Sequence, residues 1–308
     1  MMRSARISQQ GVAIITALLL TSLAIAIVTS LFWHQQVQVR AIENQRLQLQ
    51  KQWIVRGALD WARLILQEDG KFSTIDDLTE PWSVPLADTR LDTYVASNST
   101  GSDVASAVLS GAIQDAQARL NLTMLASHGV VNSVEVTAFE KLLSALQQDP
   151  SLARVAAQQI ALTQRHDSAK PGSAQPMRFI HVDDLLSLPG YTPVVMAALR
   201  DHIVFLPRAT PVNINTAGID VVVARLPQIS RADAGMLVAQ RRSKSFRNMN
   251  EVTLSLPNSP AIDSSLLSVS THFFLVNGLI TIRHASLQVQ GLVERSGAAT
   301  YLLWMREV

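Results

Sequence analysis

Residues 12–33 read VAIITALLLTSLAIAIVTSLFW, a continuous apolar stretch near the amino end of the chain. It contains no charged residue, no glycine and no proline. A helix rises about 1.5 Å per residue, so the stretch would be about 33 Å long, enough for the roughly 30 Å hydrocarbon core of a bilayer. The sequence therefore predicts a membrane-spanning helix.

The charges beside this stretch predict its orientation. Arg3 and Arg6 precede it, whereas the first basic residue after it is Arg40. Basic residues close to a span stay in the cytoplasm, so we expect a cytoplasmic amino terminus and the bulk of the chain on the other side. Without Arg3 and Arg6 the basic residues only equal the 24 acidic ones, so the basic surplus of a nucleic-acid-binding protein is missing.

Composition excludes several other classes. Charged residues make up 16% and hydrophobic residues 48% of the 308 residues, which rules out a disordered polyelectrolyte. The chain has no cysteine, which excludes a disulfide framework, thiolate metal sites and a cysteine nucleophile. The length suits about two domains, or one domain with an elongated part.

The helical pattern continues beyond the membrane. From residue 32 to residue 67 there is no proline, and Gly57 is the only glycine. Five apolar residues recur on one helical face: Leu47, Ile54, Ala58, Trp61 and Ile65. We therefore expect one helix of about 55 residues, whose second half packs on a globular head with Trp61 in the core. The alternative is a plain signal anchor followed by a coiled stalk.

The residues before the span carry a resemblance. Ser8-Gln9-Gln10-Gly11 directly precedes Val12 and resembles the type IV prepilin signal. In that family a membrane peptidase cuts after the glycine and methylates the new amino terminus, which implies processing at Gly11 and Val12. Glycine suits such a site because it leaves the backbone unhindered. The helix then packs into a filament, and here the membrane-level face would include Ile14, Leu18 and Ile25.

The fifth position of the processed chain points to one branch of this family. Most pilins and pseudopilins have Glu there, whereas this chain has Thr16. The regular exception is the type II secretion system protein K, the largest minor pseudopilin. A buried carboxylate is costly without a partner, and a subunit at a filament tip lacks one set of neighbours and could dispense with it.

A second motif resembles the same protein K family. Residues 115–122 read DAQARLNL and match the box D-A-Q-x-R-x-N-L, although Leu120 and Thr123 stand where that family often has Phe and Asn. Alternating Leu120 and Leu122 should face a core. The polar residues Asp115, Arg119 and Asn121 can bond the backbone at a turn.

The middle of the chain is helical by pattern. Helices are expected from residue 133 to 165, a loop over residues 166–176, and two helix-turn-helix units over 182–200 and 212–242, where Asn215 or Thr216 would cap a helix. These units resemble helix-hairpin-helix modules, but their turns lack the Gly-x-Gly that phosphate binding needs. We interpret them as packing units, with a solvated basic surface formed by Arg241, Arg242, Lys244 and Arg247.

The carboxyl end changes to strands. Three alternating apolar runs between Phe273 and Trp304 predict a three-stranded antiparallel sheet, with breaks near Arg283-His284 and Ser296-Gly297. Residues 91–96 (LDTYVA) predict one more strand. Pilin-type heads lay such a sheet against the long helix, which implies an α+β fold with a large all-helical insertion of the helix-hairpin-helix or SAM-like kind.

These patterns divide the chain into six expected segments. They are a leader (1–11), a transmembrane part (12–33) and an amphipathic part (34–67) of the helix, the first part of the head (68–118), the helical insertion (119–270) and the carboxyl-terminal sheet (271–308).

Few residues suggest chemistry. His181, Asp183 and Asp184 cluster, but the two acids fit the start of a helix better than a metal. Four acids in one loop region could hold calcium, as in relatives, or be solvated: Asp76, Asp77, Asp88 and Asp92. We find no Walker loop, serine elbow, zinc motif or dinucleotide fingerprint, and we expect neither a cofactor nor catalysis.

The resemblance implies a function. It predicts a minor pseudopilin that caps the pseudopilus tip and helps initiate its assembly for export of folded proteins. Expected partners are the I-, J- and H-type pseudopilins, the inner-membrane assembly platform and prepilin peptidase, with the head in the periplasm. The alternatives are a tip-located minor pilin of a type IV pilus or DNA-uptake machine, and a membrane-anchored enzyme.

Overall fold

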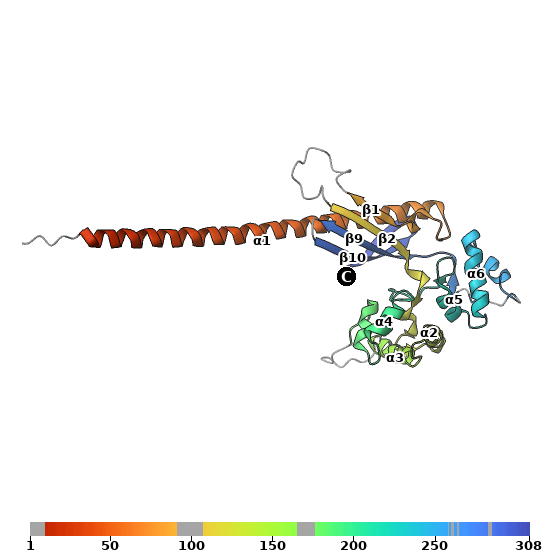
Figure 1. Cartoon of the computed structure of the whole chain (residues 1–308). Helices are drawn as coiled ribbons and strands as arrows, with labels where there is room; N and C mark the ends of the chain where they lie inside the picture. The colour runs from red at the N-terminus through yellow and green to blue at the C-terminus, as the bar shows by residue number, and fades with distance from the viewer. Residues whose placement is uncertain are drawn as a thin grey trace, which may run out of the picture.

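A long helix dominates the molecule. The computed structural model describes residues 10–90, 107–164, 176–282 without 258, 260, 261 and 264, and 285–308. Helix α1 (Gln10–Phe72) has 63 residues, and Figure 1 shows it as a nearly straight rod. Within Val12–Phe72 it contains a stretch that is long and apolar enough to cross a membrane, by length and composition. It continues five residues past the end that the sequence pattern predicts, through Gly70 to Phe72.

The second half of α1 lies against a five-stranded antiparallel sheet with the order β1-β2-β9-β10-β11. The strands are β1 (Leu86–Arg90), β2 (Ala107–Asp115), β9 (Phe273–Ile282), β10 (Ala285–Ser296) and β11 (Ala299–Glu307). The predicted carboxyl-terminal sheet is therefore confirmed, including the hairpin in which Ser296 pairs with Ala299. The strand predicted at residues 91–96 lies outside the described residues.

The contact between α1 and the sheet corrects the predicted helical face. The buried stripe of α1 consists of Val55, Leu59, Ala62 and Leu66. Ile54, Ala58 and Ile65 border it and are partly buried. Trp61, which we expected in the core, is 48% exposed. Leu47 also packs against this core, so four of the five predicted residues contact it. The fully buried positions lie one residue further along the helix, and Trp61 is the residue that the pattern misplaced.

The segment between β2 and β9 is mostly helical and forms its own core. Its helices are α2 (Ser133–Ala145), α3 (Leu152–Gln164), α4 (Pro193–Leu199), α5 (Ile219–Arg225), α6 (Arg231–Ser243), α7 (Met249–Leu254) and the 3₁₀ helices η4 (Ala116–Ala118), η5 (Leu122–Leu125) and η6 (Val182–Ser187). Leu120 and Leu122 lie in this core as predicted. Arg225 and Glu135 form an ion pair inside it, with Nη1–Oε2 at 2.7 Å.

Short strand pairs hold the helical segment together. β3 (Leu120–Asn121) pairs with β6 (Ile203–Val204), and β7 (Val212–Asn213) pairs with β8 (Leu267–Ser268), both in parallel. β4 (Ala126–Ser127) and β5 (Val130–Val131) form a small hairpin. The chain thus enters the helical segment from β2 and returns into β9, which gives an α+β fold with helices inserted into the sheet of a pilin-like head. Most of the loop predicted at 166–176 lies outside the described residues.

Candidate functional site

The apolar side chains in the first part of α1 are exposed. Ile14, Leu18 and Ile25 are exposed by 63%, 64% and 66%, so no residue in the described part of the chain covers them. The Thr16 hydroxyl donates to the carbonyl oxygens of Val12 and Ala13, at 3.1 and 3.0 Å. Thr16 is therefore satisfied within its own helix and needs no polar partner in lipid. Gly11 falls in the first turn of α1.

A buried polar network joins the head to the helical segment. Asp115, at the end of β2, accepts hydrogen bonds from Gln117 N at 2.7 Å, Asn213 Nδ2 at 2.8 Å and Thr216 Oγ1 at 2.6 Å. Asn213 Nδ2 also donates to the Asp76 carbonyl oxygen at 3.0 Å. Burial raises the pKa of the Asp115 carboxyl. Asp115 thereby ties the entry of the helical segment to β7 and to the loop after α1.

This network corrects one predicted cap. Helix α5 begins after Gly218, so neither Asn215 nor Thr216 caps it. Asn215 instead pairs with the backbone of Phe246, accepting from its N–H at 3.0 Å and donating to its carbonyl at 2.9 Å. The polar residues of the DAQARLNL box do bond the backbone as predicted. Asn121, for example, accepts from Thr123 N and Leu206 N.

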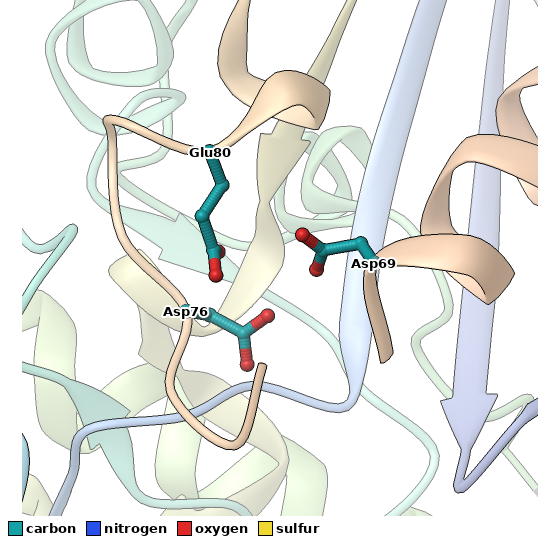
Figure 2. A group of neighbouring side chains, drawn as sticks. All are labelled: Asp69, Asp76 and Glu80. Atoms are coloured by element: carbon teal, nitrogen blue, oxygen red, sulfur yellow. The ribbon is translucent and has the colours of Figure 1, made fainter. Parts of the chain in front are cut away.

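Three carboxylates meet beside the network, where α1 ends. Asp69 lies in the last turns of α1, and Asp76 and Glu80 lie in the loop that follows (Figure 2). Their nearest oxygens are within 4.8 Å of one another. Burial raises the pKa of each, that of Asp76 to about 6. Such a group resembles a cation site, so its hydrogen bonds decide what it does.

The carboxylates are already engaged by N–H groups. Arg295, on β10, donates to Asp69 Oδ2 at 2.7 Å and to Asp76 Oδ1. The other Asp76 oxygen accepts from Thr271 N at 2.7 Å, and Glu80 Oε2 accepts from Trp82 Nε1 at 2.7 Å. Calcium needs six to eight oxygen ligands, and here the guanidinium supplies the positive charge instead. We therefore interpret the group as an ion-pair clamp between α1, the loop and the sheet.

Three of the four predicted calcium residues are described by the structure, and they do not form one site. Of these three, only Asp76 belongs to the carboxylate group. Asp77 accepts from the backbone and hydroxyl of Thr79, Asp88 is exposed on β1, and Asp92 lies outside the described residues. Asp69 and Arg295 could not be predicted as partners from the sequence, because 226 residues separate them and no local spacing signals their contact.

The cluster at His181 has the structural role that we favoured. Asp184 Oδ2 accepts from the backbone N–H groups of Ile180 and His181 at 2.8 and 2.9 Å, which caps η6. Asp183 pairs with Arg200 and Arg306, at 2.7 and 2.9 Å. The His181 ring lies edge-on to Trp304 of β11, with centroids 4.5 Å apart. These contacts fasten the helical segment to the last strand of the sheet.

The basic surface predicted after α5 is smaller than expected. Arg242, Lys244 and Arg247 are exposed, but Arg241 is buried and donates to the carbonyl oxygen of Ile214. Burial lowers the pKa of Arg241 to about 10. Its guanidinium thus links α6 to the backbone just after β7. The spacing of basic residues along α6 does not indicate that Arg241 is buried.

Comparison with known proteins agrees with this architecture. Residues 118–208 and 212–270 match two adjoining family models, both described as type II secretion system protein K. The type II secretion system protein K of Pseudomonas aeruginosa PAO1 is 24% identical over 299 residues, which cover 88% of this chain and 84% of that protein.

A solved structure has a similar fold. The crystal structure of the GspK-GspI-GspJ complex from the type 2 secretion system of enterotoxigenic Escherichia coli contains a chain that is 20% identical, with a TM-score of 0.68. The match covers 86% of this chain and 98% of that one. With the family models on adjoining segments and a relative that aligns along most of its length, the chain belongs to the type II secretion system protein K family of minor pseudopilins.

Proposed function

We propose that this minor pseudopilin caps the periplasmic tip of the pseudopilus and helps to initiate its assembly for the export of folded proteins. The role is that of a structural subunit without catalysis. Its apolar amino-terminal helix fits a protein anchored in the bacterial inner membrane, with the amino terminus in the cytoplasm and the head in the periplasm.

The observation that carries this proposal is the bulk at one end of the molecule. Figure 1 shows α5 and α6 beyond the end of α1 that is farthest from the membrane span, with α2, α3 and α4 below the sheet. We propose that residues 119–270 form the inserted domain that makes up this bulk. Successive subunits of a filament with a rise on the order of 10 Å are only about seven helical residues apart. A repeated insertion of this size would clash with the next subunit, so the chain fits where nothing stacks above it.

Processing and partners follow from the same role. We propose that prepilin peptidase cuts after Gly11 and methylates Val12, and that Ile14, Thr16, Leu18 and Ile25 then pack against neighbouring helices in the membrane. The similar solved structure is a complex of GspK with GspI and GspJ. We propose corresponding partners of the I, J and H types for this chain, together with the inner-membrane assembly platform.

Copy number tests the tip position. Quantitative mass spectrometry of purified pseudopili should find about one copy of this chain per filament, against many copies of the major subunit. The I- and J-type pseudopilins serve as controls, because a shared tip complex predicts similar numbers for all three. A copy number that grows with filament length would contradict the cap.

A further inference from the structure

Two hollows lie where the helical segment meets the face of the sheet that is turned away from α1. Each has a volume of about 270 Å³. Ile180 and Phe205 of the helical segment and Trp304 of β11 line both hollows, so these three side chains form the wall between them. Atoms beside a hollow lack packing partners on that side. The contact between the helical segment and Trp304 therefore opens at a lower cost than a close-packed core does.

His181 stands at this wall, directly before η6, and a histidine can change its charge near neutral pH. Its ring lies edge-on to that of Trp304, with the centroids 4.5 Å apart. Its Nδ1 atom is buried and has no hydrogen-bond partner in the described part of the chain. A protonated imidazole donates from both ring nitrogens, so a proton on Nδ1 would be buried without an acceptor. Burial accordingly lowers the pKa of His181, and the charge of Arg306 lowers it further.

The charged groups that face this ring from the surrounding elements are already engaged with one another. They are Arg119, Asp183, Asp184, Arg200, Asp201 and Arg306. Asp183 accepts from Arg200 at 2.7 Å and from Arg306 at 2.9 Å. Asp184 accepts from two backbone N–H groups at the start of η6, and Asp201 lies 4.0 Å from Arg119. Asp183 and Asp184 attract a proton to His181, but each of them already has donors, whereas two guanidinium groups stand beside the new charge.

We propose that the contact between His181 and Trp304 is a latch that acid opens: protonation of the His181 ring parts η6 from β11 and joins the two hollows into one cleft. The rest of the junction stays closed. Val204 and Leu206 of the helical segment pack with Leu292 of the sheet in one buried cluster, and such apolar contacts do not depend on pH. The inference concerns a movement of the helical segment and is independent of the place of the chain in a filament.

A distance measurement across the latch tests the proposal. The chain has no cysteine, so Leu186→Cys in η6 and Met305→Cys in β11 place two thiols at exposed positions for spin labels. The full-length chain is measured in detergent by pulsed electron paramagnetic resonance at pH 7.5 and at pH 5.5. One short distance is expected at pH 7.5, and a second, longer distance should appear at pH 5.5 and disappear again when the pH is restored.

Fluorescence gives an independent readout without labels. The signal of Trp304 is the difference between the wild-type chain and Trp304→Phe. Opening of the latch exposes this ring to solvent, so the constant for quenching of Trp304 by acrylamide should be at least twofold larger at pH 5.5 than at pH 7.5. The signal of the other tryptophans, read from Trp304→Phe, should change little between the two pH values.

His181→Phe is the decisive variant, because it keeps an aromatic ring against Trp304 and cannot take up a proton. It should show the short distance and the low quenching constant at both pH values. His202→Gln is the matched control. His202 also belongs to the helical segment, but its ring faces Asp220 of α5, with Nε2 at 4.0 Å from Oδ2, so its removal should leave the acid response unchanged.

Three results would overturn the latch. The first is a wild-type chain that keeps the single short distance at pH 5.5. The second is a His181→Phe variant that opens as the wild-type chain does. The third is a wild-type chain that unfolds as a whole at pH 5.5, which the melting temperature at that pH would reveal.

Discussion

Arg295 shows how one side chain can connect three elements of the molecule. Its guanidinium is 8% exposed and contacts Asp69 of α1 and Asp76 of the following loop. It also lies 4.8 Å from the centroid of the Phe274 ring. Removing one member of a buried ion pair lowers the stability of the folded chain more than replacing all of its members by apolar residues does. The reason is that the remaining charge stays buried without an opposite charge beside it.

We therefore predict that Arg295→Met destabilises the chain by about 3–5 kcal/mol, because two buried carboxylates lose the guanidinium that pairs with them. Chemical denaturation in detergent would measure the change. Arg208→Met is the matched control, since Arg208 also pairs with a carboxylate, Glu294, but is 52% exposed. It should cost less than about 1 kcal/mol. Equal losses in the two variants would refute the clamp.

Gly11 carries a separate prediction at the same scale. If prepilin peptidase cuts after Gly11, the mature chain begins at a methylated Val12, and Gly11→Val leaves the full-length precursor because a branched side chain hinders the extended backbone at the cleavage site. The intact mass of the membrane-purified protein distinguishes the two forms. Thr16→Ala should be processed normally, since its hydroxyl bonds only its own helix. A wild-type chain that still starts at Met1 in cells with the peptidase would contradict processing at Gly11.

At the scale of elements, the sequence predicts which segments are helices and strands better than which face is buried. The period of α1 was recognisable, yet its buried stripe lies one residue beyond the predicted one. Trp61 lines a hollow beside this stripe, so apolar residues occupy an exposed flank of the helix as well as its buried face. Periodicity alone cannot separate these two surfaces. In β9, by contrast, alternate residues face two cores: Phe274 and Val276 contact one, and Phe273 and Leu275 contact the other.

The difference between the two faces of α1 can be measured. Leu59 is 5% exposed and packs on the sheet, so Leu59→Ala should cost about 2–5 kcal/mol. Trp61→Ala should cost clearly less than the 3–5 kcal/mol expected for a fully buried tryptophan, because about half of its side chain is already in solvent. Thermal and chemical unfolding of both variants would test this order. A larger loss for Trp61→Ala would show that the predicted stripe had been right.

At the scale of the whole molecule, the links between head and helical segment could not be predicted. The motif at residues 115–122 predicts a turn, and the structure has a 3₁₀ turn at Ala116–Ala118. Its carboxylate, however, finds Asn213 and Thr216, which are 98 and 101 residues away in the chain. Arg295 reaches Asp76 across 219 residues. Such contacts form only when distant segments of the chain meet in the folded structure. A sequence pattern can therefore indicate that a polar residue needs a partner, but it cannot indicate which residue the partner is.

These links should make the stability of the whole molecule depend on pH. Burial raises the pKa of Asp76 to about 6, against the pull of Arg295 and Thr271 N in the opposite direction and with Asp115 adding repulsion. The folded chain therefore holds this proton more tightly than the unfolded chain does. The associated stability is fully present below about pH 4 and is lost as the pH rises to about 6, a change on the order of 3 kcal/mol.

Asp76→Asn isolates this contribution, because an amide has no proton to lose in this range. Melting temperatures of the wild-type chain and of Asp76→Asn would be measured from pH 4 to pH 7. His181 acts in the opposite direction, since burial lowers its pKa and its neutral form is favoured as the pH rises. Asp69, Glu80 and Asp115, whose pKa values burial also raises, act in the same direction as Asp76. The difference between the two melting curves therefore measures the contribution of Asp76 to the pH dependence of stability. The slope of either curve alone also contains the contributions of the other groups. We expect the wild-type chain to lose stability relative to Asp76→Asn as the pH rises from 4 to 6, with a constant difference above pH 7. Parallel curves across the whole range would mean that Asp76 keeps its charge throughout, and that Arg295 outweighs the cost of burial.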